Sequence, residues 1–461
     1  MRNAPYSAAK NEIVSNSPTH PPPGEVNTAV QVHLGEQFQQ RNVRLYVLKW
    51  CVVFLAAPVM YIGFVQVGLC KRLGASDFVA NLPSSVYLAM AAFPVIMVWA
   101  VPQVRFLKLV MMIGFITSAV MGALTAVVLW LPVPDWLRIV IVIVHAAVVA
   151  CSSGTAWAFE WELIGRGVSE SRRGRMFAIA FSIGPLFAVA GSLAAQLIIN
   201  NEVFGWTPPF WPEIPYPLNY TVMYGMTLPL LLLAGLLVSG YVIPLPKTEL
   251  QRQPFIQGVF GGFGQLVCNR FIVMACVAYL LVYSGTLIQN NMVLFTREAV
   301  ELPEDTFVGY QLAIRFGCKV FAGLILGWLL KLTNPCMNLY ATALLVALGV
   351  MGIIIAPLFS AGLFFLIAFG FNGAGELMGL YYPYYVLCLS PKSQMRRNMA
   401  FVMLISAPVG LAPALYGAIS DRWGLTTSFW LALALVIAGL VLVAATLPAR
   451  PRPRPEDLES D

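Results

Sequence analysis

Three long stretches of the sequence contain no charged residue, and they constrain the fold more than any other feature. They are Ile214–Pro246, Leu332–Gly375 and Trp423–Ala449. A helix needs about 20 apolar residues to cross the hydrocarbon core of a bilayer. Leu332–Gly375 is therefore long enough for two crossings. Only 11% of the 461 residues are charged, against about 25% in a soluble protein, so the sequence predicts an integral membrane protein.

Twelve apolar blocks follow one another along the chain. Each is interpreted as a helix, because an open strand cannot satisfy its backbone N–H and C=O groups in lipid. The predicted spans, numbered 1 to 12, are 45–69, 78–101, 107–131, 137–163, 175–199, 219–244, 270–294, 307–331, 338–358, 362–389, 398–420 and 425–448. The predicted fold class is an all-α integral membrane protein with 12 transmembrane helices.

The distribution of Lys and Arg orients these spans. If both termini are cytoplasmic, the tails and even-numbered loops hold 21 of the 28 basic residues, and the outer loops hold five. Such a bias towards the cytoplasmic side is typical of membrane proteins. It also accounts for the net charge of +7 without a nucleic-acid partner. The sequence therefore predicts a multi-pass protein of the cell membrane with cytoplasmic N- and C-termini.

The spans divide evenly around a longer connection. The predicted organisation is a disordered cytoplasmic tail (1–44), an N-terminal six-helix half (45–244), a central cytoplasmic linker (245–269), a C-terminal six-helix half (270–448) and a cytoplasmic tail (449–461). An internal repeat supports this 6+6 division, since similar Arg-rich segments, Arg172–Ala178 and Arg396–Phe401, lead into spans 5 and 11. Transporters built from two such halves bind their solute near the midplane between them.

One local motif lies at the junction of spans 11 and 12. It reads Gly417-Ala-Ile-Ser-Asp421-Arg422-Trp-Gly424. Together with the 6+6 plan, this motif resembles the G-x-x-x-D-R-x-G junction of the major facilitator superfamily. The resemblance implies that fold, a tight turn at which Asp421 can cap the next helix, and a gating role for Asp421 and Arg422. The corresponding region after span 2, Trp99–Lys108, lacks the acidic residue of the family motif.

Charges inside the spans are the first candidates for function, because each costs at least about 2.5–3.5 kcal/mol at the centre of a membrane helix. Arg315 and Lys319 are four residues apart and share one face of span 8. Glu376 lies at a similar depth in span 10. The three residues are predicted to form a substrate-binding cavity, in which Glu376 is also a candidate proton site. The alternative is a buried structural ion pair.

Two further carboxylates lie near the inner end of span 4. Glu160 and Glu162 are close in sequence to Arg166, Arg172 and Arg173. We expect a network of salt bridges that holds an inner gate shut, and substrate contact is the alternative. Breaking such a network would accompany opening and would bias the equilibrium between two conformations.

Several uncharged polar residues complete the set of candidates. His145, in the middle of span 4, is either a proton relay or a neutral group that bonds to a neighbouring helix. Tyr381 and Tyr382 in span 10 are predicted to line a cavity, where an aromatic ring can stack on a solute and its hydroxyl can bind it. Asn372 and Tyr283 are weaker substrate-binding candidates, since helix-to-helix hydrogen bonds explain them as well.

The prediction for function is a secondary active transporter that moves a small polar or anionic solute by alternating access, with H+ as a candidate coupling ion. No nucleotide-binding, hydrolase or metal-protease motif occurs in the sequence. We therefore expect no enzymatic activity, no cofactor and no metal, and a monomer whose partners are its solute and the lipid bilayer. The alternatives are a non-transporting sensor or assembly protein of the same fold, and an intramembrane enzyme.

Overall fold

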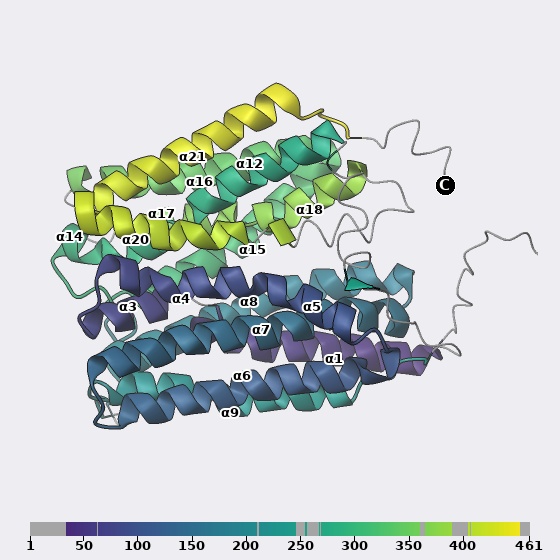
Figure 1. The fold of residues 1–461 in the computed structure, drawn as a ribbon, viewed down its shortest axis with the longest axis horizontal. Coiled ribbons are helices and arrows are strands. Elements are labelled where there is room, and N and C mark those ends of the chain that lie inside the picture. The colour runs from purple at the N-terminus through teal and green to yellow at the C-terminus, as the bar shows by residue number, and fades with distance from the viewer. Residues whose placement is uncertain are drawn as a thin grey trace, which may run out of the picture. The chain divides into compact units, whose positions relative to one another are not determined.

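A computed structural model describes residues 34–61, 63–209, 212–245, 254–255, 267, 269–359, 365–389, 404–405 and 407–451 of the chain. Apart from one β-bridge between Val203 and Trp206, the described residues form helices and their connections. The helices run roughly parallel to one another and form two groups, one from each half of the sequence (Figure 1). This arrangement confirms the all-α membrane fold in two six-helix halves.

The N-terminal half contains spans 1 to 6. Span 1 is built from α1 (Glu36–Leu55), α2 (Ala57–Met60) and α3 (Phe64–Arg72), and span 2 from α4 (Asp77–Ala89), η1 (Met90–Ala92) and α5 (Phe93–Ala100). A short 3-10 turn, η2 (Val104–Phe106), precedes span 3. Spans 3 to 6 are single helices, α6 (Leu107–Trp130), α7 (Asp135–Gly167), α8 (Glu170–Asn200) and α9 (Leu218–Ser239).

The C-terminal half contains spans 7 to 12. Span 7 comprises α12 (Arg270–Thr286) and α13 (Gln289–Leu294), with α14 (Thr296–Val300) beyond its end. Spans 8 and 9 are α15 (Val308–Leu332) and α16 (Pro335–Ile355), the second ending in η3 (Ala356–Phe359). Span 10 is α17 (Leu366–Gly375) and α18 (Met378–Leu389). The described part of span 11 is η6 (Pro408–Gly410) and α20 (Leu411–Trp423), and span 12 is α21 (Leu425–Thr446).

Nine of the predicted spans correspond to helical segments that are long and apolar enough to cross a membrane. The other three are spans 1, 10 and 11. Span 1 is interrupted between α2 and α3, and span 10 between α17 and α18, while the first part of span 11 lies outside the described residues. The interruptions divide spans 1 and 10 into shorter helices.

The first helix is longer than its apolar block. It begins at Glu36, inside the segment that the sequence assigns to the tail. Its first turns contain Glu, Gln and Arg, which favour helix and can extend it into water beyond the membrane. Residues 1–33, most of the linker and the last residues of the C-terminal tail lie outside the described part of the chain.

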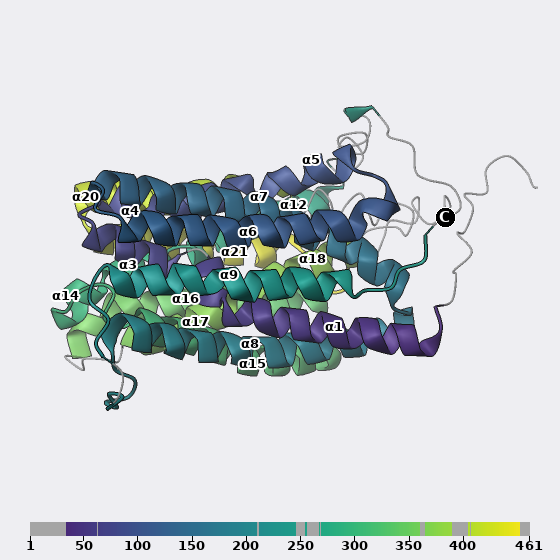
Figure 2. The same cartoon turned by 90° about the horizontal axis from the view of Figure 1, so that it is seen from below.

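The two halves are packed together at one end of the bundle through two pairs of helices. Helix α4 packs on α20, and α8 packs on α15. Both views show α15 beside α8 (Figures 1 and 2). The sequence orients this end outward, and we refer to it as the outer end. Gly417 allows the close approach of α20, because a Cβ there would lie 2.5 Å from the carbonyl oxygen of Asp77 at the start of α4.

Candidate functional site

A group of three charged residues lies inside the C-terminal half, between α15 and the break in span 10. Arg315 and Lys319 project from α15, and Glu376 occupies the break between α17 and α18. Nη2 of Arg315 is 2.6 Å from one carboxylate oxygen of Glu376, and the ammonium group of Lys319 contacts the other. Both ion pairs considered at the level of sequence are therefore present. We call these residues the charge triad.

The charge triad is buried, but not equally. The side chains of Arg315 and Glu376 are each 9% exposed, whereas that of Lys319 is 21% exposed. Helices α15 and α17 come close enough to pair these charges because position 373 is glycine. A Cβ on Gly373 would lie 2.5 Å from the carbonyl oxygen of Arg315. Lys319 is thus the member of the triad that a ligand can reach most easily.

The electrostatics of the charge triad favour an anion. Two cations face one carboxylate, which leaves one positive charge without a compensating negative charge within the group. Nε of Arg315 is buried and has no hydrogen-bond acceptor among the described residues. A buried charge without a counterion is costly, so the site gains stability when an anionic group enters it.

Aromatic side chains surround the charge triad. The guanidinium of Arg315 lies 5.0 Å from the ring centroid of Phe64 in the N-terminal half, and the ammonium of Lys319 lies 5.3 Å from that of Phe316. Tyr61, also in the N-terminal half, packs edge-on against Phe316 with 5.5 Å between centroids. The triad is therefore at the boundary between the two halves.

A second buried ion pair lies inside the N-terminal half. Lys49 of α1 pairs with Glu160 of α7, and their side chains are 0% and 4% exposed. The Lys49 ammonium is 4.1 Å from the ring centroid of Trp50 and is also near Tyr46 and Phe115. Because this pair has little access to water, it fixes α1 against α7.

The charges near the inner end of the N-terminal half do not form the expected single network. Glu162 pairs with Arg166 one turn along α7, at 2.8 Å. Arg172 pairs with Glu36 of α1 at 2.6 Å, and the hydrogen bond and charge of this guanidinium hold the pKa of the Glu36 carboxyl below its usual range. Arg173 donates to the carbonyl oxygens of Val168 and Gly165. The Glu162–Arg166 pair is as expected, but Glu160 pairs with Lys49, so the single network does not form among the described residues.

Polar bonds join the two halves at the outer end. Asp305, in the connection between α14 and α15, accepts hydrogen bonds from Arg72 (2.7 Å) and from the hydroxyl of Tyr220 (3.0 Å). Gln196 of α8 donates to the carbonyl of Thr306 at 2.8 Å and accepts from the N–H of Gly309. These bonds tie spans 1, 5 and 6 to the start of span 8.

Asn291 lies on α13 and connects α4 to two further helices of the C-terminal half, α20 and α21. Its side-chain oxygen accepts from Asn81 of α4 at 2.8 Å. Its side-chain nitrogen donates to the hydroxyls of Ser420 on α20 and Ser428 on α21, each at 2.8 Å. All four side chains are buried. A buried network of amides and hydroxyls depends on one arrangement of its side chains, so it helps to specify how the helices meet.

Asp421 also acts between the halves, and not at the next helix as the sequence suggested. Its two carboxylate oxygens accept from the backbone N–H groups of Asp77 (2.8 Å) and Phe78 (3.0 Å), the first residues of α4. A carboxylate at a helix N-terminus satisfies free N–H groups and complements the helix dipole. The prediction that Asp421 caps the helix that follows it is wrong, because Gly417 brings the start of α4 within reach.

Comparisons with known proteins were made by sequence and by structure. The sequence matches no protein-family profile and no curated protein. The structure is similar to a mutant of the nucleoside transporter NupG, with 10% identity, a TM-score of 0.66, and coverage of 88% of this chain and 99% of that one. It is also similar to a D-xylose-proton symporter (14% identity, TM-score 0.64, coverage 90% and 99%) and a peptide-bound POT family transporter (14%, 0.63, 88% and 94%). The chain has the same fold as these transporters.

Within this fold, the predicted tyrosines of span 10 are buried between packed helices. Tyr382 is fully buried, donates to Sγ of Cys276 at 2.8 Å and stacks on Tyr279 with 4.1 Å between centroids. Tyr381 is also buried, at 6% exposure. These contacts place Tyr382 between α18 and α12, so the expectation that it lines a cavity is wrong.

Three other residues that the sequence analysis proposed for the site are His145, Asn372 and Tyr283. His145 is buried in the N-terminal half, edge-on to Tyr224 at 5.0 Å. Asn372 is buried one turn before Glu376, and its amide has no hydrogen-bond partner among the described residues. Tyr283 of α12 stacks on Tyr279 with 5.0 Å between centroids.

Sequence reasoning missed Lys49, Asp305 and Asn291. Lys49 was assigned to the basic inner rim of span 1, yet apolar residues flank it on both sides, from Leu45 to Leu48 and from Trp50 to Leu55. This pattern is a usable sign of burial. Asp305 and Asn291 carry no comparable local signal, since their partners come from distant spans.

Proposed function

We propose that this protein is a secondary transporter that moves a small solute with an anionic group by alternating access between its two halves. The observation that carries the proposal is the charge triad, with its uncompensated positive charge at the boundary of the halves. The fold and the three transporters to which the structure is similar support the transport activity. One of these proteins is a nucleoside transporter, one a D-xylose symporter and one a transporter bound to a peptide, so they leave the solute of this protein open.

In this proposal the outer end is closed in the described conformation. The described hydrogen bonds and ion pairs between the two helical halves all involve residues of the outer side. The deepest is the 2.8 Å bond between Ser85 and the N–H of Ala414. An alternating-access cycle requires these bonds to break when the outer end opens. Asp305, Asn291 and Asp421 therefore form the proposed outer gate.

Binding should depend on the two cations of the charge triad. We expect a thermal-shift screen of small carboxylates, phosphates and neutral sugars to identify anionic ligands. Arg315→Ala or Lys319→Ala should then weaken binding by roughly 10-fold or more, because each removes a charge-assisted contact worth about 1.5–3 kcal/mol. Lys331→Ala is the matched control, since Lys331 lies exposed at the inner end of the same helix. Unchanged affinities in both triad variants would contradict the proposed site.

Glu376 is the proposed proton-coupling residue, because protonating it would release both cations to the solute. We expect proteoliposome uptake by Glu376→Gln to be weaker than wild type and independent of pH, since glutamine cannot titrate. Full uptake that still depends on pH would remove Glu376 as a proton site and leave anion binding intact.

The closed outer end should depend on the charge of Asp421. Asp421→Asn keeps the shape of the side chain but weakens the cap on α4, which is worth about 1 kcal/mol. We expect hydrogen exchange at the first turn of α4 to become roughly fivefold faster. Asp135→Asn is the control, because Asp135 begins α7 at the same end but pairs within its own helix, with Arg138. Equal exchange in Asp421→Asn and wild type would show that this cap does not hold the gate.

A further inference from the structure

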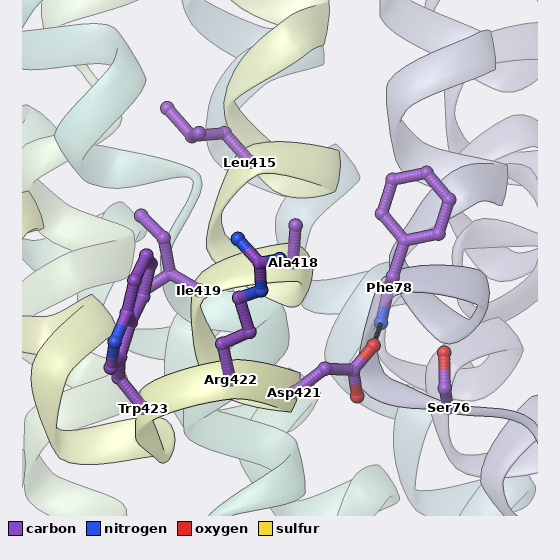
Figure 3. A pocket seen from close by; sticks show the side chains of 8 residues that line it. All are labelled: Ser76, Phe78, Leu415, Ala418, Ile419, Asp421, Arg422 and Trp423. Carbon is purple, nitrogen blue, oxygen red and sulfur yellow. Dashed lines mark hydrogen bonds between the residues drawn. The ribbon is translucent and has the colours of Figure 1, made fainter.

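A groove at the outer end runs between α4 and α20. Ser76 and Phe78 form one wall, and residues of α20 from Leu415 to Trp423 form the other (Figure 3). Because the walls belong to different halves, the groove exists only while α4 and α20 are packed together. It lies on the outside of the bundle, away from the charge triad.

Arg422 places a positive charge in this groove, and no carboxylate of the described residues pairs with it. Its side chain points back along α20 towards Ala418 (Figure 3), as helical side chains lean towards the helix N-terminus. The neighbouring carboxylate of Asp421 is occupied by the N–H groups of α4. Among the described residues, the one recorded contact of the Arg422 guanidinium is with the Trp423 ring, 5.9 Å from its centroid. The groove can therefore accept an anionic group at Arg422.

The remaining wall of the groove is apolar and exposed. Phe78, Leu415 and Leu411 are exposed on the surface of the two helices, and residues 411, 415, 418 and 422 follow one face of α20 at helical spacing. In a membrane-spanning protein such a face contacts acyl chains. Trp423 is exposed at the end of α20, where aromatic residues mark the membrane interface.

We propose that this groove binds a phospholipid of the outer leaflet, with its phosphate at Arg422 and an acyl chain along Phe78 and Leu415. Arginine suits a phosphate because its planar guanidinium can donate two parallel hydrogen bonds. The groove has the same order of chemical groups as the lipid. Its cation lies near the interface, where the phosphate would be, and its apolar side chains lie towards the membrane centre, where the acyl chain would be.

The lipid would act on the outer gate. A ligand shifts a conformational equilibrium towards the state that it binds better. Since the two walls separate when the outer end opens, the bound phospholipid stabilises the closed outer end. It would do so from the surface of the bundle, without contact with the charge triad or with the solute.

Native mass spectrometry of the purified full-length protein tests the binding. Phosphatidylglycerol, phosphatidylcholine and diacylglycerol are offered separately to wild type, Arg422→Gln and Arg297→Gln. Arg297 is the matched control, an exposed arginine of the same end. We expect wild type and Arg297→Gln to retain both phospholipids but not diacylglycerol. Arg422→Gln should bind both phospholipids roughly tenfold more weakly, because it loses a charge-assisted contact.

A second measurement separates this site from lipid bound elsewhere. Hydrogen exchange at the first turn of α4, which holds the N–H groups of Asp77 and Phe78, should slow when phosphatidylglycerol is added to wild type, and should not respond in Arg422→Gln. The proposal is overturned if Arg422→Gln retains phospholipid as wild type does, or if wild type binds diacylglycerol as well as phospholipid. It is also overturned if added phosphatidylglycerol does not change the exchange rate at the first turn of α4 in wild type. A larger effect of phosphatidylglycerol than of phosphatidylcholine would assign the headgroup as anionic.

Discussion

Replacing Lys49 alone with methionine is expected to lower the free energy of unfolding by about 3–5 kcal/mol, the range found when one partner of a buried ion pair is removed. Methionine keeps the unbranched shape of the lysine chain. The loss comes from Glu160, whose carboxylate would remain buried among helices α1 and α7 without a counterion. Unfolding of the purified protein by denaturant, followed by tryptophan fluorescence, measures the change.

The double variant Lys49→Met with Glu160→Gln is the informative comparison. It removes both charges, so we expect it to recover most of the stability that the single variant loses, because a buried ion pair gains little over a neutral pair. Arg166→Met is the control. Its partner Glu162 is half-exposed, and such pairs contribute about 0–1 kcal/mol. Strictly additive losses in the double variant would show that Lys49 and Glu160 do not depend on each other.

Replacing Gly417 with leucine is expected to reduce solute uptake roughly tenfold or more. A Cβ at this position would lie 2.5 Å from the carbonyl oxygen of Asp77 and 2.7 Å from Cα of Phe78. Forcing such an overlap costs about 1–3 kcal/mol. This cost lowers the population of the state with a closed outer end, while a state in which α4 and α20 are apart does not pay it. Uptake in proteoliposomes, with any ligand found by the screen above, measures the effect.

Gly327→Leu is the matched control for this experiment. Gly327 lies on α15, and a Cβ there would meet no atom within 4 Å. Its uptake should equal that of wild type, and both variants should unfold at similar temperatures. If Gly417→Leu transports at the wild-type rate, the close packing of α20 on α4 is not required during the cycle.

The positions of nine spans, counted among the described residues, could be predicted from the sequence, but the interruptions of spans 1 and 10 could not. Apolar blocks report a bilayer crossing because the cost of exposing polar groups to lipid applies to every residue in the block. The break at Glu376 follows Gly375 in a stretch that is otherwise continuously helical in pattern. The break lies where span 10 packs against α15 and α16. The local sequence of span 10 contains no information about these neighbours. The start of α1 was also misplaced, since polar residues can continue a helix outside the membrane.

Between different spans, the sequence predicted ion pairs correctly only for charged residues that lie at the same depth. Arg315, Lys319 and Glu376 were expected at one depth, and they pair. Lys49 was missed because it lies close to the predicted inner boundary, where lysine is normally solvated. The target of Asp421 was wrong for a different reason. The N–H groups that it binds lie 344 and 343 residues earlier in the chain, and a local motif contains no information about such a contact.

The placement of the buried charges also bears on how the chain is made. In each half the cation is synthesised first, and its carboxylate arrives in the fourth helix of that half, as Glu160 in span 4 and Glu376 in span 10. An unpaired cation costs at least about 2.5–3.5 kcal/mol at the centre of a membrane helix and less near its ends. A nascent chain that stops after its third or ninth span therefore exposes uncompensated charge to lipid. The fourth helix of each half therefore supplies the one carboxylate with which the buried cations of that half pair.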